Sequence, residues 1–112
     1  MGDPTPLNEL EQMVLLALAR LGEDGYGVTI REEIERRAGR PVSIAAVYAA
    51  LDRVERRKVV RSWLSDPTPE RGGRAKKHFR IEPKGVALLQ DARDAMQRMW
   101  EGLDLRPNPR RS

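Results

Sequence analysis

The stretch that decides the fold is residues 42–55, VSIAAVYAALDRVE. Ser43 belongs to the residue types that cap helices, and apolar residues follow it at the three- and four-residue spacing of a helix. One face of this helix carries the stripe expected to be buried, formed by Ile44, Val47, Tyr48, Leu51 and Val54. The opposite, exposed face is expected to carry Ala45, Ala46, Ala49 and Ala50, and after them Asp52, Arg53 and Arg56. High helix propensity explains alanines there, and so does function, because small side chains let a helix approach the edge of a DNA groove.

Two further helices are expected before this segment. The first covers about residues 9–21, where Asn8 and Glu11 have the spacing of a capping box. The second covers about residues 27–38, and a glycine follows each of these helices as a stop signal. Residues 41–42 are expected to form a short strand ahead of the third helix.

After the third helix the apolar residues alternate with a period of two, which is the period of a strand. Strands are expected over residues 60–65 and 76–81, joined by a loop over 66–74 that contains two prolines and two glycines. A last helix is expected from Pro83 to about Leu103, because proline suits the first turn of a helix. Three helices followed by a β-hairpin form a winged helix-turn-helix, in which the hairpin is the wing. The predicted fold class is therefore α+β and mainly α.

The 112 residues have room for one hydrophobic core. We expect a winged-helix DNA-binding domain over residues 1–82, a C-terminal dimerisation helix over 83–105 and a flexible tail over 106–112. The last helix carries an apolar stripe that is too long for one small domain to cover, which favours a homodimer. The expected dimer interface consists of Leu89, Ala92, Met96, Met99, Trp100 and Leu103.

The charge of the chain is concentrated in one region. The formal net charge is +4, from 21 basic and 17 acidic residues. Residues 53–84 hold eleven basic and four acidic residues, a net charge of +7, so the rest of the chain carries −3. A local basic stretch is the electrostatic footprint of a protein that docks on phosphates, although a solvated charged face is its plainer explanation.

Composition excludes several classes of protein. The chain has no cysteine and one histidine, so neither a disulfide scaffold nor a metal site is expected. His78 stands beside Lys77 with no serine motif near it, so we expect no catalytic base, no enzyme activity and no cofactor. No apolar run approaches the roughly 18 residues of a membrane span, and the first residues lack a signal-peptide pattern. A soluble, cytoplasmic protein without membrane contact is the expectation.

Double-stranded DNA is the expected partner, and two parts of the chain supply candidate contacts. From the third helix, base edges or thymine methyls would be approached by Ser43, Ala45, Ala46 and Ala49. Tyr48 would reach a phosphate through its hydroxyl while its ring stays in the core, and Arg53 is a second phosphate candidate.

The hairpin supplies the other candidate contacts. Gly72 and Gly73 permit a close approach of the backbone, and Arg71 or Arg74 would enter a minor groove. The sugar-phosphate backbone would then run along Lys76, Lys77 and His78.

Three segments of the chain resemble the PadR family of bacterial transcriptional regulators. They are DGYGV at residues 24–28, the helix sequence of residues 42–55, and GGRAKKHFRI at residues 72–81. Family members typically show a Tyr-Gly pair at the second helix, Leu-Tyr-x-x-Leu in the third, and Gly-Arg-x-x-Lys-Tyr-Tyr in the wing. The resemblance covers about residues 7–89, and with one C-terminal helix the chain is similar to the compact type of the family.

The resemblance implies a homodimeric repressor of a pseudo-palindromic operator, with DNA binding that a small apolar ligand weakens. In that case Met96, Met99 and Trp100 would line a crevice for a flat hydrophobic effector, whereas packing in a core or dimer interface is their plainer role. A different function also stays open, a winged-helix protein interaction module whose basic hairpin docks on an acidic partner. Salt-dependent binding to random duplex DNA would distinguish the two.

The chain departs from the family pattern at three places. Lys58 stands where glycine is usual after the third helix, which predicts a positive φ at a cost of roughly 1–2 kcal/mol. His78 and Phe79 replace a tyrosine pair, so a phosphate contact there would come from the imidazole. Glu82 and Pro83 replace the usual threonine cap of the last helix.

Overall fold

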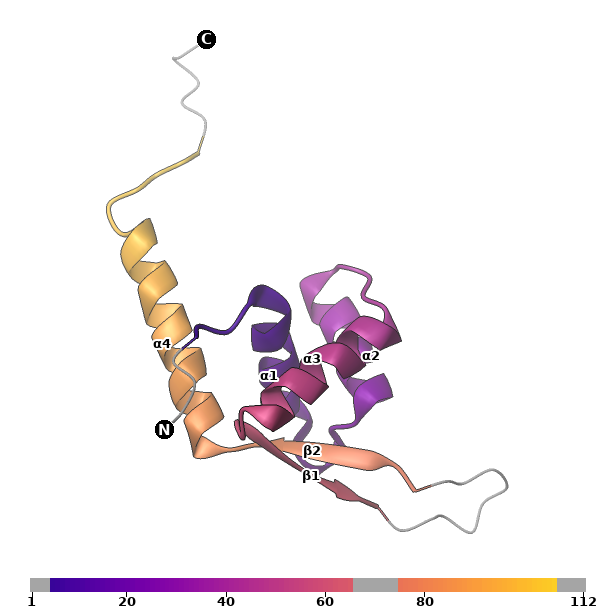
Figure 1. Cartoon of the computed structure of the whole chain (residues 1–112). Helices are drawn as coiled ribbons and strands as arrows, with labels where there is room; N and C mark the ends of the chain where they lie inside the picture. The colour runs from indigo at the N-terminus through magenta and orange to yellow at the C-terminus, as the bar shows by residue number, and fades with distance from the viewer. Residues whose placement is uncertain (1–4, 66–74, 107–112) are drawn as a thin grey trace.

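The computed structural model describes residues 5–65 and 75–106, and it confirms a mainly helical winged-helix fold (Figure 1). A short 3-10 turn, η1, connects the first two helices. The elements in chain order are α1 (Glu9–Leu21), η1 (Gly22–Asp24), α2 (Gly27–Ala38), α3 (Ile44–Arg56), β1 (Val60–Leu64), β2 (Lys77–Ile81) and α4 (Pro83–Trp100).

Local sequence signals set the helix ends. At α1 the capping box forms, because Glu11 N–H donates to Asn8 Oδ1 at 2.8 Å and Asn8 N–H donates to Glu11 Oε1 at 2.9 Å. Ser43 caps α3 by accepting a hydrogen bond from Ala46 N–H at 3.0 Å. Gly39 ends α2 with a φ of 68°, a left-handed conformation that glycine adopts without steric cost.

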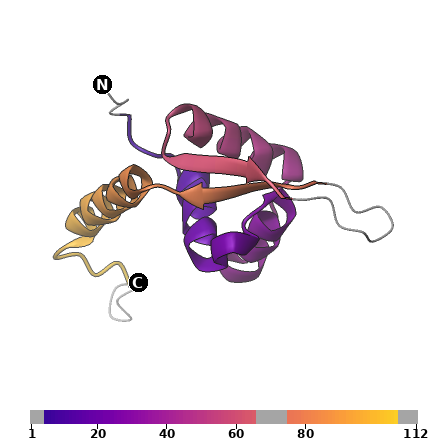
Figure 2. The ribbon, with the colours of Figure 1, turned by 90° about the horizontal axis from the view of Figure 1, so that it is seen from below.

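Helices α1, α2 and α3 pack around one core, and the two strands close it from one side. Figure 2 shows the strands crossing in front of the three helices. Leu15, Ile30 and Leu51 contribute fully buried side chains from the three helices, and Phe79 brings a buried ring from β2. The sheet therefore covers one side of the helical core and also forms the projecting wing.

The wing has a third chain segment, which the sequence did not predict. Strands β1 and β2 are antiparallel, with Ser62 opposite Phe79 and Trp63 opposite His78. On the other edge of β2, Tyr26 forms an isolated bridge with His78, and Phe79 N–H donates to the carbonyl of Gly25 at 2.8 Å. The wing is thus joined to the segment that leads into α2.

The expected strand at residues 41–42 is wrong. These residues form no strand, and Val42 N–H donates to the Glu35 carboxylate at 3.2 Å instead of to a neighbouring strand. The connection between α2 and α3 is held by a side chain of α2, so it has no need of a sheet.

Helix α4 projects from the body, as Figure 1 shows at the left. Gly85 is buried at its start, against the carbonyl of Val59 and the side chain of Ile81. The helix ends at Trp100, and a turn over residues 101–102 follows it. Leu103, expected to be the last residue of the helix, lies beyond this turn, and its N–H donates to the Trp100 carbonyl at 3.0 Å. Within the described residues, no helix is both long and apolar enough to cross a membrane.

Candidate nucleic-acid interface

Fewer alanines lie on the exposed face of α3 than the sequence predicts. Ala45 and Ala49 are exposed and Ala46 is half-buried, but Ala50 is 0% exposed and belongs to the core. The reason is that Ala50 falls on the same helical face as Val47, Leu51 and Val54, all of them buried. The outward face therefore consists of Ala45 and Ala49 followed by Asp52 and Arg56, which form an ion pair with each other.

Tyr48 does not lie in the core as expected. Its side chain is 49% exposed, and its ring lies against the backbone of Gly27 at the start of α2. A Cβ at Gly27 would be 2.5 Å from the Tyr48 ring carbon Cζ and hydroxyl, so glycine is what allows this approach. Tyr48 therefore bridges α2 and α3 at the edge of the exposed face, where a phenol can reach solvent or a phosphate.

The wing lies directly beside α3. Glu55 of α3 accepts hydrogen bonds from the Ser62 hydroxyl of β1 and from Lys77 Nζ of β2, the latter at 2.9 Å. The Ser62 hydroxyl and then the Lys77 ammonium hold the pKa of the Glu55 carboxyl below its ordinary value of 4.5. Lys77, a candidate DNA contact, is thus paired with a carboxylate that fixes the wing against the recognition helix.

The outer side of the wing carries a group of aromatic and cationic side chains. Trp63 and His78 face each other across the strands with ring centroids 5.6 Å apart, and Tyr26 lies 5.3 Å from the His78 ring. Lys76 Nζ lies 4.4 Å from the Tyr26 ring centroid, and His78 Nδ1 is 2.9 Å from the carbonyl oxygen of Glu23. Lys76 and His78 are therefore held by contacts with Glu23 of η1 and with Tyr26, the residue before α2.

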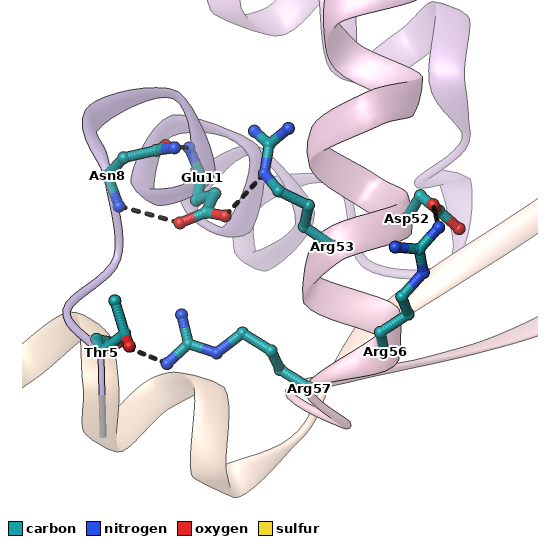
Figure 3. A network of polar contacts seen from close by, with 7 residues as sticks. All are labelled: Thr5, Asn8, Glu11, Asp52, Arg53, Arg56 and Arg57. Carbon is teal, nitrogen blue, oxygen red and sulfur yellow. Dashed lines mark hydrogen bonds and ion pairs between the residues drawn. The ribbon is translucent and has the colours of Figure 1, made fainter. Parts of the chain in front are cut away.

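Arg53 lies on the flank of α3 that faces α1, away from the wing. Its Nε donates to Glu11 Oε2 at 3.0 Å, an interaction drawn in Figure 3. Arg53 therefore has a structural contact in addition to its predicted role, and Ser43 likewise serves as a helix cap. Four further candidates, Arg71, Gly72, Gly73 and Arg74, lie outside the described residues.

Two residues of this surface are not among the contacts predicted from the sequence. Arg56 lies on the exposed face of α3, as its spacing predicts, and it follows Asp52 by one helical turn on the alanine side. Tyr26 joins the wing to α2, but an aromatic residue before a helix gives no pattern from which its pairing with β2 follows. Within residues 5–65 and 75–106, no group of three or more His, Cys, Asp or Glu residues is placed to hold a metal ion.

A recognition helix with a small-residue face, flanked by a cationic hairpin, defines a winged helix-turn-helix DNA-binding protein. The family model of the PadR-like transcriptional regulators matches residues 14–91, well over half of the chain. The chain belongs to this family, whose members are transcription regulators that act through DNA binding and are not enzymes. A comparison with curated proteins finds no match.

Solved structures of similar fold include several transcription regulators. A PadR family regulator from Clostridium difficile R20291 has a TM-score of 0.69 and 18% identity, covering 82% of this chain and 91% of its own. H. salinarum RosR has a TM-score of 0.65 and 17% identity, covering 91% and 84%. Bordetella bronchiseptica BpsR, whose DNA binding is regulated by 6-hydroxynicotinic acid, has a TM-score of 0.60 and 20% identity, covering 93% and 68%. At these identities the likeness concerns the fold.

Proposed function

We propose that the protein is a homodimeric repressor that binds a pseudo-palindromic operator and acts in the cytoplasm. The observation that carries this proposal is the outward face of α3, where Ala45 and Ala49 are exposed beside the wing. In this arrangement α3 enters a major groove, with Ser43, Ala45, Ala46 and Ala49 near the base edges. Tyr48, Arg53 and the wing residues, including Lys76, Lys77 and His78, contact the phosphates. Repression is the mode of action that the family resemblance implies.

The apolar surface of α4 supports the homodimer. Met99 is 74% exposed and Trp100 is 55% exposed, Met96 is exposed on the same helix, and Leu103 is exposed just beyond its end. Beside them lies a groove of about 630 Å³ between α1 and α4, lined by apolar residues that include Leu16, Leu89, Met96 and Trp100. A contiguous apolar surface of this kind marks an interaction site, so α4 and the residues that follow it to 105 act as a dimerisation segment attached to the DNA-binding domain.

A small flat apolar effector fits the same groove. Its volume lies in the range of about 300–1,000 Å³ that is usual for small-molecule sites, and Met96 and Trp100 offer polarisable and aromatic contacts in its lining. Met99, the third residue expected to contact an effector, is exposed but does not line this groove. BpsR, which has a similar fold, is regulated by an aromatic acid. Binding there would move α4 and with it the spacing of the two α3 helices.

The test is selection of duplexes from a random pool, followed by affinity measurements at several salt concentrations. We expect an inverted repeat whose half-sites are about one helical turn apart, bound with an affinity that falls as salt rises. Salt-independent binding, or no binding to any duplex, would contradict the proposal. Capture of acidic proteins with no DNA binding would instead favour an interaction module.

A further inference from the structure

The flank of α3 that faces away from the wing borders a cleft of about 410 Å³. One wall is the chain from Thr5 to Glu11, and the other is the C-terminal half of α3. Figure 3 shows Arg53 and Arg57 reaching from α3 toward Glu11 and Thr5, whereas Arg56 lies along α3 beside Asp52. The cleft is lined by Thr5, Pro6, Asn8, Glu11, Arg53, Arg56 and Arg57.

The cleft is built on one buried carboxylate. Glu11 is 5% exposed, and its two oxygens accept hydrogen bonds from Asn8 N–H at 2.9 Å and from Arg53 Nε at 3.0 Å. Arg53 uses only Nε in this contact, and among the described residues its two terminal nitrogens have no hydrogen-bond partner. Glu11 therefore fixes the direction of the Arg53 guanidinium, and the two terminal nitrogens of that group remain available to a ligand.

The second wall is fixed independently. Arg57 Nη2 donates to the carbonyl of Thr5 at 2.5 Å, and Lys84 Nζ donates to the carbonyl of Arg57 at 3.0 Å. These bonds tie the N-terminal segment and the start of α4 to the end of α3. The cleft thus holds its form without a ligand and presents three arginines against one buried acid.

Arg56 is the most accessible of the three arginines. Its partner Asp52 and the guanidinium itself are both exposed, and an exposed ion pair of this kind contributes only about 0–1 kcal/mol. The Arg56 guanidinium can therefore leave Asp52 for a stronger anion at little cost. A phosphate offers such an anion, because it accepts paired hydrogen bonds from a guanidinium.

The position of the cleft relative to the wing identifies the source of that phosphate. An α-helix with its side chains is about 10–12 Å across and the major groove is about 12 Å wide, so both flanks of an inserted helix lie near phosphates. The wing serves one flank of α3, through Glu55 and Lys77. We infer that the cleft binds one phosphate of the duplex on the opposite groove wall, through Arg53 and Arg56, with Glu11 as the residue that positions Arg53. This inference rests on the proposed function.

The test compares the salt dependence of binding to one fixed duplex for the full-length protein and for Arg56→Gln. Each lost phosphate contact lowers the steepness of log affinity against log salt by about 0.9, and Arg56 supplies one of the two guanidinium groups at this phosphate, so we expect a decrease of up to about 0.9 per subunit. Affinity should fall equally for all duplex sequences, because a phosphate contact carries no sequence information. Arg36→Gln on α2 is the matched control, since Arg36 is also exposed and also pairs with an acid on its own helix.

A second variant removes the pair at the base of the cleft. Glu11→Gln with Arg53→Gln leaves two amides that can keep one hydrogen bond, so no charge is left buried and alone. We expect a similar loss of steepness, with unchanged helical content by circular dichroism. If this variant fails to fold, Arg56→Gln decides alone. Wild-type steepness in Arg56→Gln would overturn the phosphate site, whereas failure of the wild-type protein to bind duplex would overturn the proposed function instead.

Discussion

At the scale of single residues, Lys58 is the one described non-glycine residue with a positive φ, 61°, as its place in the sequence predicts. Its N–H donates to the Glu55 carbonyl at 2.9 Å and closes the end of α3 before β1 begins. A side chain in the left-handed region costs roughly 1–2 kcal/mol, part of which a glycine there would recover.

Replacing Lys58 should therefore stabilise the protein. We expect Lys58→Gly to raise the free energy of unfolding by about 1 kcal/mol, because relief of strain exceeds the entropy that glycine adds to the unfolded chain. Lys58→Ala is the control, since alanine keeps the strained conformation and should bring no gain. Urea denaturation at neutral pH measures both variants, and equal stabilities for glycine and alanine would contradict the prediction.

Glu55 should give the stability a pH dependence of known sign. Its pKa is lowered in the folded protein by the Ser62 hydroxyl and Lys77, so its ionised form stabilises the fold above about pH 4.5. That contribution is lost as pH falls through the lowered pKa. The difference in unfolding free energy between wild type and Glu55→Gln should therefore be larger at pH 7 than at pH 3, as urea denaturation at both values would measure. A constant difference would show that the two bonds do not distinguish the ionised form.

The sequence misjudged how two residues of α3 are buried. The three- and four-residue spacing of the apolar stripe predicts a buried Tyr48 ring, yet a position beside Gly27 holds the ring at the surface. Ala50 was assigned to the exposed face because it continues a run of alanines, although its helical face is the buried one.

At the scale of elements, the packing of the first turn of α4 against the domain depends on one glycine. A Cβ at Gly85 would be 2.6 Å from the Val59 carbonyl oxygen and 2.8 Å from Ile81 Cγ1. A backbone atom cannot move aside as a side-chain tip can, so the first turn of α4 would have to shift. The packing of α4 on the domain is therefore sensitive to a single methyl group.

Gly85→Ala should lower the free energy of unfolding by about 1–3 kcal/mol, the usual cost of overpacking, despite the better helix propensity of alanine. Gly27→Ala is the matched control, because the nearest atoms to its new methyl belong to the outer end of the half-exposed Tyr48 side chain, which has room to turn aside, so the change should cost less. Thermal unfolding followed by circular dichroism compares the two. A larger loss for Gly27→Ala than for Gly85→Ala would contradict this view of α4.

The helices and the hairpin could be predicted from sequence because their signals are local. Caps such as Asn8 and Ser43, and the change of period after α3, act within a few residues. The pairing of Tyr26 with His78 could not be predicted, since it joins segments about fifty residues apart and needs only one backbone bridge. The same holds for the contact between Glu11 and Arg53. Helical periodicity assigns each of these residues to its own helix but does not predict a contact between the two helices.

At the scale of the whole molecule, the exposed apolar face of α4 makes the proposed dimer testable. Met99→Glu places a charge in the middle of that face, where burial in an interface would be costly. We expect wild type to sediment as a dimer and Met99→Glu as a monomer, with duplex affinity reduced because half-sites are no longer joined. Arg98→Glu on the same turn is a control for added charge. A dimeric Met99→Glu would place the interface elsewhere.

The bridge between Tyr26 and His78 makes the hairpin part of the same cooperative unit as α2. Tyr26 pairs with β2, and its carbonyl accepts the first hydrogen bond of α2, from Ile30 N–H at 2.9 Å. Opening of the strands therefore releases the first turn of α2 as well, and the amides of Phe79 and Ile30 should exchange with solvent in one shared opening event. The hairpin and the first turn of α2 thus fold and unfold as one unit.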